Sequence, residues 1–311
     1  MKNQDRIFYY DFVFVDQDNI IYTFTPAIGK YLKTLKIHYC HQPHREEEEI
    51  LKKLTENHHG MPFYLKMYNK FFKDKYLRLN VENAQYMDYI LCNSFFTHEN
   101  ILRIFGLNSK VSYLSVNKDQ FQVLNLPRKN IVLSVGSVSV NKGFEFVIKS
   151  IARVDENIRP KFIIVGYRSD IFWSDYLESL ANELNVELEI LQGISYDELV
   201  KLYNEVKMVI FAPYLEPFGL VPLESFACGT PVIGVNEGGV KETVKHRENG
   251  LLLERDEDIF AKGITELIVD EELWKKCSDY GPKYVDDYWS LDHNGKIFVE
   301  NIYNILNKEL D

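Results

Sequence analysis

Residues 216–244, EPFGLVPLESFACGTPVIGVNEGGVKETV, hold the side chains of this chain that are best suited to chemistry. Two carboxylates, Glu216 and Glu224, stand eight positions apart with a loop rich in glycine and proline between them. Carboxylates accept hydrogen bonds from hydroxyl groups such as those of a sugar. Pro222 suits a first helical turn, and a loop leading into a helix offers free backbone N–H groups to a phosphate. The pattern therefore predicts a nucleotide-sugar site.

The elements around this stretch predict a parallel sheet with helices on both faces. Apolar, β-rich segments alternate with segments of helical spacing, and ligands of such a sheet bind at the carboxyl ends of its strands. We expect strands at residues 131–135, 162–165, 186–191, 208–211, 232–235 and 251–253. We expect helices at residues 142–153, 176–184 and 196–204, with a further helix after the 216–220 loop.

The first part of the chain shows a shorter mixed pattern. We expect buried parallel strands at residues 12–15 and 37–40 with a helix at 24–35 between them, followed by strands at 89–92 and 111–116. Residues 118–130 are polar and contain Pro127, so we interpret them as an interdomain linker. The domains predicted are residues 1–125, a partial Rossmann-like domain on the acceptor side, and residues 126–288, a nucleotide-sugar-binding Rossmann-like domain.

The composition of the 311 residues is that of a globular protein, with 46% apolar and 26% charged residues. The net charge is −10, and most of the excess acid lies after residue 128, which argues against a nucleic acid partner. Four scattered cysteines form no CxxC pair, which favours a reducing, cytoplasmic location. The chain starts without a signal-peptide pattern and contains no window of about 20 apolar residues.

Residues 60–80 combine five basic side chains with interleaved aromatic ones and a single acidic residue. Such a segment is able to lie on an anionic membrane surface, which would make the protein peripheral to the membrane. The alternative is an amphipathic helix whose aromatic face is buried and whose basic face is solvated.

With these motifs in order, the chain resembles the GT-B glycosyltransferases of glycosyltransferase family 4, which are retaining, metal-independent enzymes typified by lipid-linked mannosyltransferases. The resemblance implies two Rossmann-like domains facing a cleft, and a C-terminal helix, here residues 289–311, that crosses back to the first domain. The segments that carry it are His41 within IHYCHQP, Asn93-Ser94, Gly136 with Lys142-Gly143, Glu216 to Leu220 with Glu224, and Trp289 to Asp292.

The resemblance implies a role for each carboxylate and for the loop between them. Glu224 would bind the ribose hydroxyls of the nucleotide. Glu216, with the backbone of Phe218, Gly219 and Leu220, would hold the donor sugar and its phosphate. Glu216 is therefore expected among the catalytic residues.

The other residues expected at the site come from four further segments. Lys142 would pair with the diphosphate and stabilise the leaving group as charge develops. His41 would contact the transferred sugar, and Gly193 and Ile194 would contact the base through backbone atoms. The spacing of the histidines near His41 does not suit a metal ion, so we expect neither a metal nor a cofactor besides the donor.

Two departures from the family pattern affect these expectations. Ser137 follows Gly136 where the family usually has an arginine, so one cation of the expected phosphate site is missing; Arg168 is one candidate to replace it. Only eleven residues precede Phe12, where the family usually has a strand, a glycine-rich loop and a further βα unit. Three explanations are therefore open: the N-terminal domain is truncated, a partner chain completes it, or the start of the chain is misassigned.

These residues favour a retaining glycosyltransferase that moves a hexose from a nucleotide-diphosphate donor to a glycan or lipid-linked acceptor. Mannose from GDP-mannose is the first expected donor by resemblance, and UDP-glucose or UDP-N-acetylglucosamine follow. The alternative is a degenerate subunit that binds the donor without activity of its own and acts through a partner chain.

Overall fold

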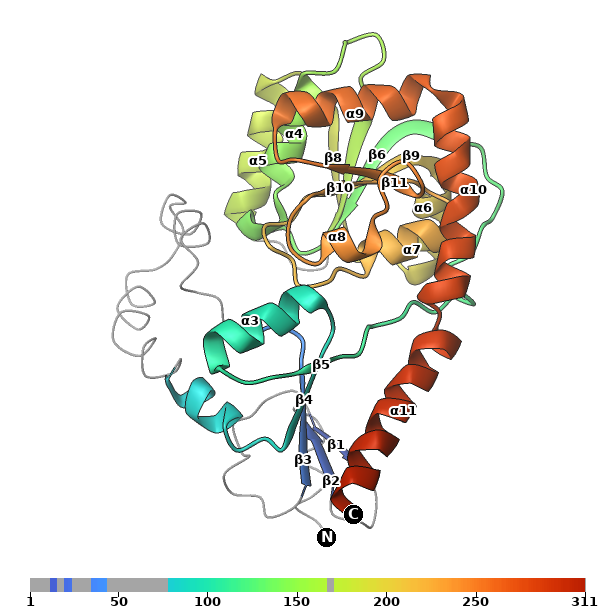
Figure 1. Cartoon of the computed structure of the whole chain (residues 1–311). Helices are drawn as coiled ribbons and strands as arrows, with labels where there is room; N and C mark the ends of the chain where they lie inside the picture. The colour runs from blue at the N-terminus through green and yellow to red at the C-terminus, as the bar shows by residue number, and fades with distance from the viewer. Residues whose placement is uncertain (1–11, 16–19, 24–34, 44–77, 167–170, 311) are drawn as a thin grey trace. The chain divides into compact units, whose positions relative to one another are not determined.

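The computed structural model describes residues 12–15, 20–23, 35–43, 78–166 and 171–310 (Figure 1). The chain divides into two compact units, one of Met1–Tyr113 with Ile297–Asp311 and one of Leu114–Lys296. All four cysteines are free and buried. In the part of the chain that the structure describes, no helix has the length and apolar composition needed to cross a membrane.

The second unit is built on a six-stranded sheet in the order β11-β10-β9-β6-β7-β8, and every pair in it is parallel. Each strand that we predicted here is present, with ends within a few residues of the expected ones. Their bounds are β6 (Lys129–Val135), β7 (Lys161–Gly166), β8 (Leu188–Gln192), β9 (Val206–Phe211), β10 (Val232–Val235) and β11 (Gly250–Leu253).

Helices lie on both sides of this sheet (Figure 1). Helix α4 packs with α5 and α9, and α7 packs with α8 and α10. Large side chains such as Phe162, Phe226 and Phe260 fill the space between helices and sheet and are fully buried. The bounds are α4 (Phe144–Ala152), α5 (Ile171–Glu183), α6 (Tyr196–Glu205), α7 (Val221–Ala227), α8 (Val240–Thr243), α9 (Glu257–Val269) and α10 (Glu271–Tyr288).

The helix predicted over residues 142–153 is in fact two elements. A 3-10 turn, η2 (Val140–Lys142), ends at Gly143, which has a φ of +72° and precedes α4. A Cβ atom at position 143 would lie 2.1 Å from the carbonyl oxygen of Ala212, so only glycine allows the chain to pass there. Lys142 therefore ends a tight turn and does not begin the helix.

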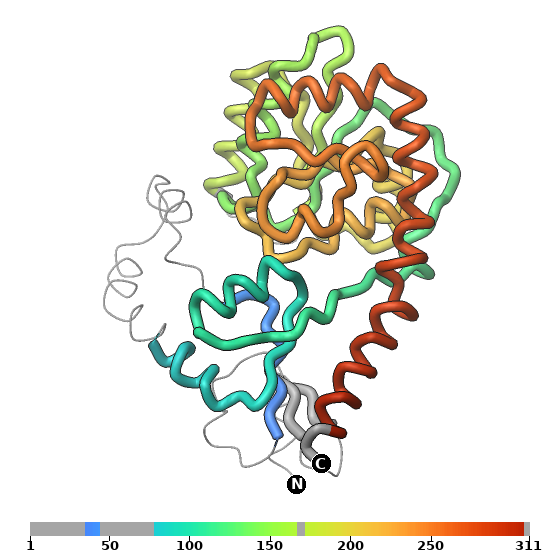
Figure 2. The backbone as a smooth tube through the Cα atoms, viewed as in Figure 1, coloured from blue at the N-terminus to red at the C-terminus, as the bar shows by residue number. Residues whose placement is uncertain are grey.

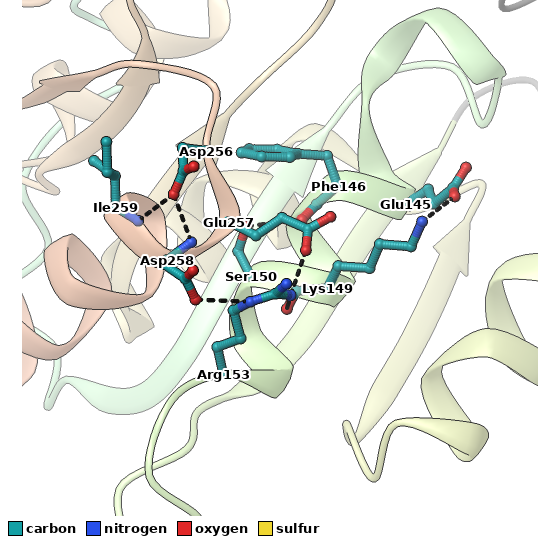
Figure 3. Close-up of polar contacts among 9 residues, drawn as sticks. All are labelled: Glu145, Phe146, Lys149, Ser150, Arg153, Asp256, Glu257, Asp258 and Ile259. Carbon is teal, nitrogen blue, oxygen red and sulfur yellow. Dashed lines mark hydrogen bonds and ion pairs between the residues drawn. The ribbon is translucent and has the colours of Figure 1, made fainter.

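The contact between α4 and α9 carries a network of charged side chains (Figure 3). Arg153 pairs with Glu257 and, at 2.8 Å, with Asp258. The side chain of Asp256 accepts hydrogen bonds of 2.9 Å from the backbone N–H groups of Asp258 and Ile259 and so caps α9. The cap fixes the start of the helix that presents both acidic partners to Arg153.

Replacing Arg153 with alanine is expected to lower the free energy of unfolding by less than about 1 kcal/mol, because exposed ion pairs are screened by water and salt. The Arg153 side chain is 44% exposed. Urea unfolding at low and high salt measures the effect, which should shrink as salt rises. A cost above about 2 kcal/mol at high salt would contradict this account.

The first unit contains a five-stranded sheet in the order β1-β2-β3-β4-β5. The strands β2 to β5 are parallel, whereas β1 pairs antiparallel with β2 in the register Val15↔Ile20. The expectation that residues 12–15 and 37–40 are parallel strands is therefore wrong: an unpredicted strand, β2, lies between them, and β1 runs antiparallel to it. The bounds are β1 (Phe12–Val15), β2 (Ile20–Thr23), β3 (Leu35–Cys40), β4 (Tyr89–Cys92) and β5 (Lys110–Val111).

The segment after β4 also differs from the expectation. The strand predicted over 111–116 is shorter than expected, because β5 ends at Val111. Helix α3 (Phe95–Phe105) was not predicted, and Ser94 caps it by accepting a 2.9 Å hydrogen bond from the N–H of Thr97. Residues 24–34 of the helix expected at 24–35, and almost all of the basic segment 60–80, lie outside the described residues, whereas Leu35 begins β3.

The segment interpreted as a linker, residues 118–130, belongs to the second unit. The backbone N–H of Leu124 donates to Asn204 Oδ1 at 2.7 Å. The guanidinium of Arg128 donates to Thr230 Oγ1 and to four backbone carbonyls of the unit. A polar composition with a proline indicated a linker, but the backbone of Leu124 and the side chain of Arg128 tie this segment to the second unit.

The C-terminal helix α11 (Leu291–Leu310) follows α10 after two residues, and Figure 2 traces the backbone from one into the other. Its residues from Ile297 onward cluster with the first unit, where the ring of Phe298 lies 6.4 Å from that of Tyr39. In the second unit, Ser290 forms a β-bridge with Val116. The predicted segment 289–311 includes this helix and the two residues before it.

Candidate functional site

The strand order of the second unit marks one place where a ligand is expected. Strands β6 and β9 are neighbours, and the chain winds away from them towards opposite edges of the sheet. Ligands of doubly wound sheets bind outside the carboxyl ends of the strands at such a switch point. The loop after β6 carries Gly136 and Lys142, and the loop after β9 carries Glu216. Topology thus brings these separate segments to the same place.

Lys142 and Glu216 meet at this place. The Nζ atom of Lys142 donates to Glu216 Oε2 at 2.8 Å, and the two side chains are only 17% and 22% exposed. A Cβ atom at Gly136 would contact the aliphatic stem of Lys142 at 3.6 Å. The residues that we predicted as a cation and a carboxylate of one site are therefore direct partners.

The loops that hold this pair are joined through the backbone. The N–H of Tyr214 donates to the carbonyl of Asn141 at 2.8 Å, next to the close passage of Gly143 past Ala212. The N–H of Gly239 donates to the carbonyl of Glu216 at 2.8 Å. The positions of Lys142 and Glu216 follow from these contacts between the loops after β6, β9 and β10.

Arg255 strengthens the same junction and was not predicted from the sequence. Its guanidinium donates to both carboxylate oxygens of Glu237, at 2.7 and 2.8 Å, and to the carbonyls of Ala212 and Pro213, at 2.9 and 2.8 Å. It also lies 3.8 Å from the ring centroid of Tyr214. We call this arrangement the Arg255 clamp; it joins the loops that follow β9, β10 and β11.

The pair Gly238-Gly239 has a structural reason at this site. A Cβ atom at Gly238 would lie 2.4 Å from the carbonyl oxygen of Glu216, and one at Gly239 would lie 2.0 Å from that of Pro217. The two glycines therefore allow the loop after β10 to lie directly on the loop that carries Glu216. Phe218 is buried and its ring packs 5.5 Å from that of Trp289.

Between Phe218 and Glu224 the chain turns into α7. Gly219 has a φ of +84°, which favours glycine, and Leu220 is the N-cap residue of α7 and is 37% exposed. The helix has only seven residues, with Pro222 in its first turn as predicted. The backbone of 218–220 is therefore presented by a turn that precedes a short helix.

Glu224 is partly exposed and has a buried neighbour. The hydroxyl of Tyr203, a fully buried residue of α6, donates to Glu224 Oε2 at 2.8 Å. Burial raises the pKa of Glu224, and the hydrogen bond from Tyr203 opposes that shift. Among the described residues, no hydrogen-bond partner is found for the second oxygen, Oε1. This atom is therefore available to accept a hydrogen bond from a ligand.

The remaining predicted residues lie in three other places. Ser137 shares the loop after β6 with Lys142, and its Oγ lies 3.1 Å from Ser139 Oγ. Gly193, with a φ of +66°, is exposed at the carboxyl end of β8, followed by the partly buried Ile194. His41 belongs to the first unit and follows β3, with its ring 4.9 Å from that of Tyr39. Arg168 lies outside the described residues.

Comparisons with known proteins agree with this architecture. An alpha-1,3/1,6-mannosyltransferase of Rhizomucor pusillus is 25% identical over 91% of this chain and 68% of its own length. An uncharacterized glycosyltransferase of Methanocaldococcus jannaschii is 30% identical over 63% of this chain and 54% of its own length. A D-inositol 3-phosphate glycosyltransferase of Rhodococcus jostii is 29% identical over 56% of this chain. The chain spans 40% of that relative's length, and about half that of the Methanocaldococcus one.

Solved structures share the fold over most of the chain. Sucrose-phosphate synthase from Thermosynechococcus elongatus superposes with a TM-score of 0.75 at 22% identity and covers 94% of this chain and 74% of its own. Anabaena HepE, in complex with UDP and glucose, gives a TM-score of 0.74 at 18% identity over 92% of this chain and 78% of its own. These likenesses confirm the predicted GT-B-type α/β fold.

The family itself follows from a match over more than half of the sequence. Residues 116–284 match the family described as glycosyl transferases group 1. The matched region contains Lys142, Glu216 and Glu224 together with the loops that join them. The chain therefore belongs to the glycosyl transferases group 1 family.

Proposed function

We propose that this chain is a retaining, metal-independent glycosyltransferase of the family 4 type, which transfers a hexose from a nucleotide-diphosphate donor. One observation carries the proposal: two carboxylates at the switch point of the second unit each have one oxygen held by a protein donor. Glu216 Oε2 is held by Lys142, and Glu224 Oε2 by Tyr203. In each case the other oxygen makes no hydrogen bond within the described residues, and sugar hydroxyls are the donors that such acceptors suit.

The roles of the residues follow from their chemistry. Glu224 Oε1 accepts from the ribose hydroxyls, and Glu216 accepts from hydroxyls of the donor sugar. Lys142 lies beside Glu216 and supplies the positive charge that a departing diphosphate requires. Since Nζ has three hydrogens and one is used by Glu216, two remain for phosphate oxygens. This cation takes the part that a metal ion plays in other transferases.

The loop after β6 offers hydroxyls where the family usually has an arginine. The Oγ atoms of Ser137 and Ser139 are 3.1 Å apart, and the hydroxyl of Ser139 donates to Asn141 Oδ1 at 2.6 Å. We propose that Ser137 contributes a neutral hydrogen bond to the diphosphate, so that Lys142 carries the main electrostatic part of leaving-group stabilisation.

The donor and acceptor are proposed by class. A relative is named a mannosyltransferase and one structural neighbour holds UDP and glucose, which supports mannose or glucose on GDP or UDP. Gly193 and Ile194 would contact the base, and His41 the transferred sugar. The acceptor is proposed to be a glycan or a lipid-linked glycan. Contact of residues 60–80 with a membrane, a cytoplasmic location, and a partner chain that completes the first domain all stay predictions.

An assay of turnover tests the proposal directly. The full-length protein is incubated with GDP-mannose, UDP-glucose or UDP-N-acetylglucosamine, with and without a membrane extract as acceptor, and release of the nucleotide and transfer of sugar are followed. We expect one donor to be consumed. Binding of a donor without turnover under every condition would overturn the enzyme proposal and favour the donor-binding subunit.

Replacing Glu224 with alanine is expected to weaken nucleoside diphosphate binding about 10- to 100-fold, the range for loss of a hydrogen bond to a charged group. Isothermal titration with GDP and UDP measures the dissociation constant. Glu272→Ala is the matched control, because Glu272 is an exposed glutamate on α10. Equal affinity of Glu224→Ala and wild type would remove Glu224 from the site.

A further inference from the structure

Among the described residues of the second unit, Tyr203 is the largest side chain that is completely shielded from solvent. It lies on α6, and its hydroxyl reaches Glu224 Oε2 at 2.8 Å. A buried phenol normally finds a hydrogen-bond partner, and most such partners are backbone carbonyls or water. Here the partner is instead a carboxylate of the candidate site.

The position of Tyr203 is fixed from two sides. Its backbone carbonyl accepts hydrogen bonds from Arg128 Nη1 at 2.8 Å and from the hydroxyl of Thr230. Its ring packs edge-on against Phe121, with the centroids 6.0 Å apart. The phenol oxygen therefore stands at a place that the core determines, independent of any ligand.

Glu224 gains a defined orientation from this neighbour. A glutamate side chain has three rotatable bonds, and a hydrogen bond at one oxygen restricts them before a ligand arrives. With Oε2 held, Oε1 is the atom left to accept from outside. Preorganisation of this kind increases affinity because less freedom is lost on binding.

The charge at Glu224 also depends on Tyr203. Burial raises the pKa of the Glu224 carboxyl, and the hydrogen bond from Tyr203 lowers it. The Cys228 thiol, whose pKa is raised to about 12 chiefly by burial, also interacts with Glu224, and the Arg128 guanidinium lies near that thiol. Near neutral pH the thiol is uncharged, so Tyr203 is the direct partner that favours the carboxylate.

We propose that Tyr203 is a positioning residue for nucleotide binding, whose hydroxyl holds one oxygen of Glu224 so that the other faces the vicinal hydroxyls of the donor ribose. The proposal rests on the function proposed above for Glu224. The two carboxylates of the site then differ in kind. Glu216 is paired with an ammonium group that compensates its charge, whereas Glu224 is held by a neutral donor.

Tyr203→Phe tests the proposal, because phenylalanine keeps the ring and removes only the hydroxyl. We expect the dissociation constant of the nucleoside diphosphate to rise about fivefold to tenfold near neutral pH. Tyr284→Phe is the matched control, since Tyr284 is also buried and its hydroxyl is 3.5 Å from the carbonyl of Glu242. That control is expected to bind as wild type does.

The pH dependence separates positioning from a merely structural role. The ribose hydroxyls favour the ionised carboxylate, so affinity falls as the pH falls through the pKa of Glu224 in the free protein. Loss of the Tyr203 hydrogen bond raises that pKa further. The decline in affinity should therefore begin at a higher pH in Tyr203→Phe than in wild type, and a loss of packing alone would not move it.

Glu224→Gln is measured in parallel, so that an error in the role of Glu224 can be told apart from an error in the role of Tyr203. If Glu224→Gln binds nucleotide as wild type does, the role of Glu224 is wrong. If Glu224→Gln binds weakly while Tyr203→Phe keeps the wild-type affinity and pH profile, the role of Tyr203 is wrong. Should Tyr203→Phe not fold, NMR of wild type with labelled tyrosine rings decides. The Tyr203 ring carbon must shift as Glu224 titrates, and the absence of that shift would overturn the proposal.

Discussion

Replacing Lys142 with alanine is expected to lower kcat about 100- to 1,000-fold, while the affinity for the donor falls by about tenfold or less. Removal of one charge-stabilising donor at a reacting centre typically has an effect of this size on kcat. Lys142 would interact more strongly with the diphosphate as it departs than with the bound donor, because negative charge increases on its oxygens during departure. The expected split between kcat and affinity follows from that difference.

Steady-state kinetics with the donor consumed by wild type, together with titration of the nucleoside diphosphate, measure both quantities. Lys149→Ala is the matched control. Lys149 lies seven residues further along on α4 and pairs with Glu145 at 2.5 Å (Figure 3); the two side chains are partly exposed. It should retain wild-type kinetics. Full activity of Lys142→Ala would remove Lys142 from the reaction.

Replacing Arg128 with methionine is expected to lower the free energy of unfolding by about 1–3 kcal/mol, the range for leaving hydrogen-bond acceptors of the protein interior without a donor. The guanidinium donates to the carbonyls of Tyr203, Val206, Cys228 and Gly229, at 2.8 to 3.3 Å, and to Thr230 Oγ1. Burial lowers its pKa, as expected for a charge taken out of water. Methionine fills much of the space but leaves these acceptors unsatisfied.

Urea unfolding followed by circular dichroism gives the free energy of Arg128→Met. The neighbouring Lys129→Met serves as control, because Lys129 is 55% exposed and pairs with Glu205 at 2.8 Å at the surface. We expect the control to differ from wild type by less than about 1 kcal/mol. A cost below about 1 kcal/mol for Arg128→Met would show that its carbonyl partners find other donors.

The strands and loops of the second unit were predictable because their signals are local. Strand β10 has the predicted ends at Val232 and Val235, since a Gly-Thr-Pro stop precedes it and a turn containing Gly-Gly follows. The pairing of Lys142 with Glu216 required one more step. It follows from the general rule that parallel strands present their carboxyl ends at one edge, applied to motifs that lie 74 positions apart.

The residues that we did not predict make contacts with residues that lie far away in the sequence. Arg128 reaches Tyr203 across 75 positions, and Arg255 reaches Ala212 across 43. Tyr203 looks like any other apolar position of an amphipathic helix, because the pattern of α6 shows which face is buried but not which buried atom is polar. One signal was available for the missed strand β2: the polar run DQDN between two β-rich segments is typical of a hairpin.

The prediction of one continuous helix over residues 142–153 was wrong for another reason, the break at Gly143. Residues 142–153 have helical spacing, and glycine within such a pattern is a weak signal of interruption. The decisive fact is the approach of the carbonyl of Ala212, which belongs to a loop nearly 70 residues further along the chain. Only the tertiary structure contains that information.

The loop after β8 is held by contacts of its own, separate from those of the Arg255 clamp, and this matters for engineering the protein. The Arg255 clamp joins the loops after β9, β10 and β11, whereas the loop after β8 ends in its own capping box, in which Ser195 and Glu198 each bond the other's backbone. Residues 193–194 can thus be exchanged together with their cap as a cassette. If residues 193–194 contact the base as proposed, grafting that cassette from a relative with another nucleotide preference should change the preferred donor base while the loops that carry Lys142 and Glu216 stay intact.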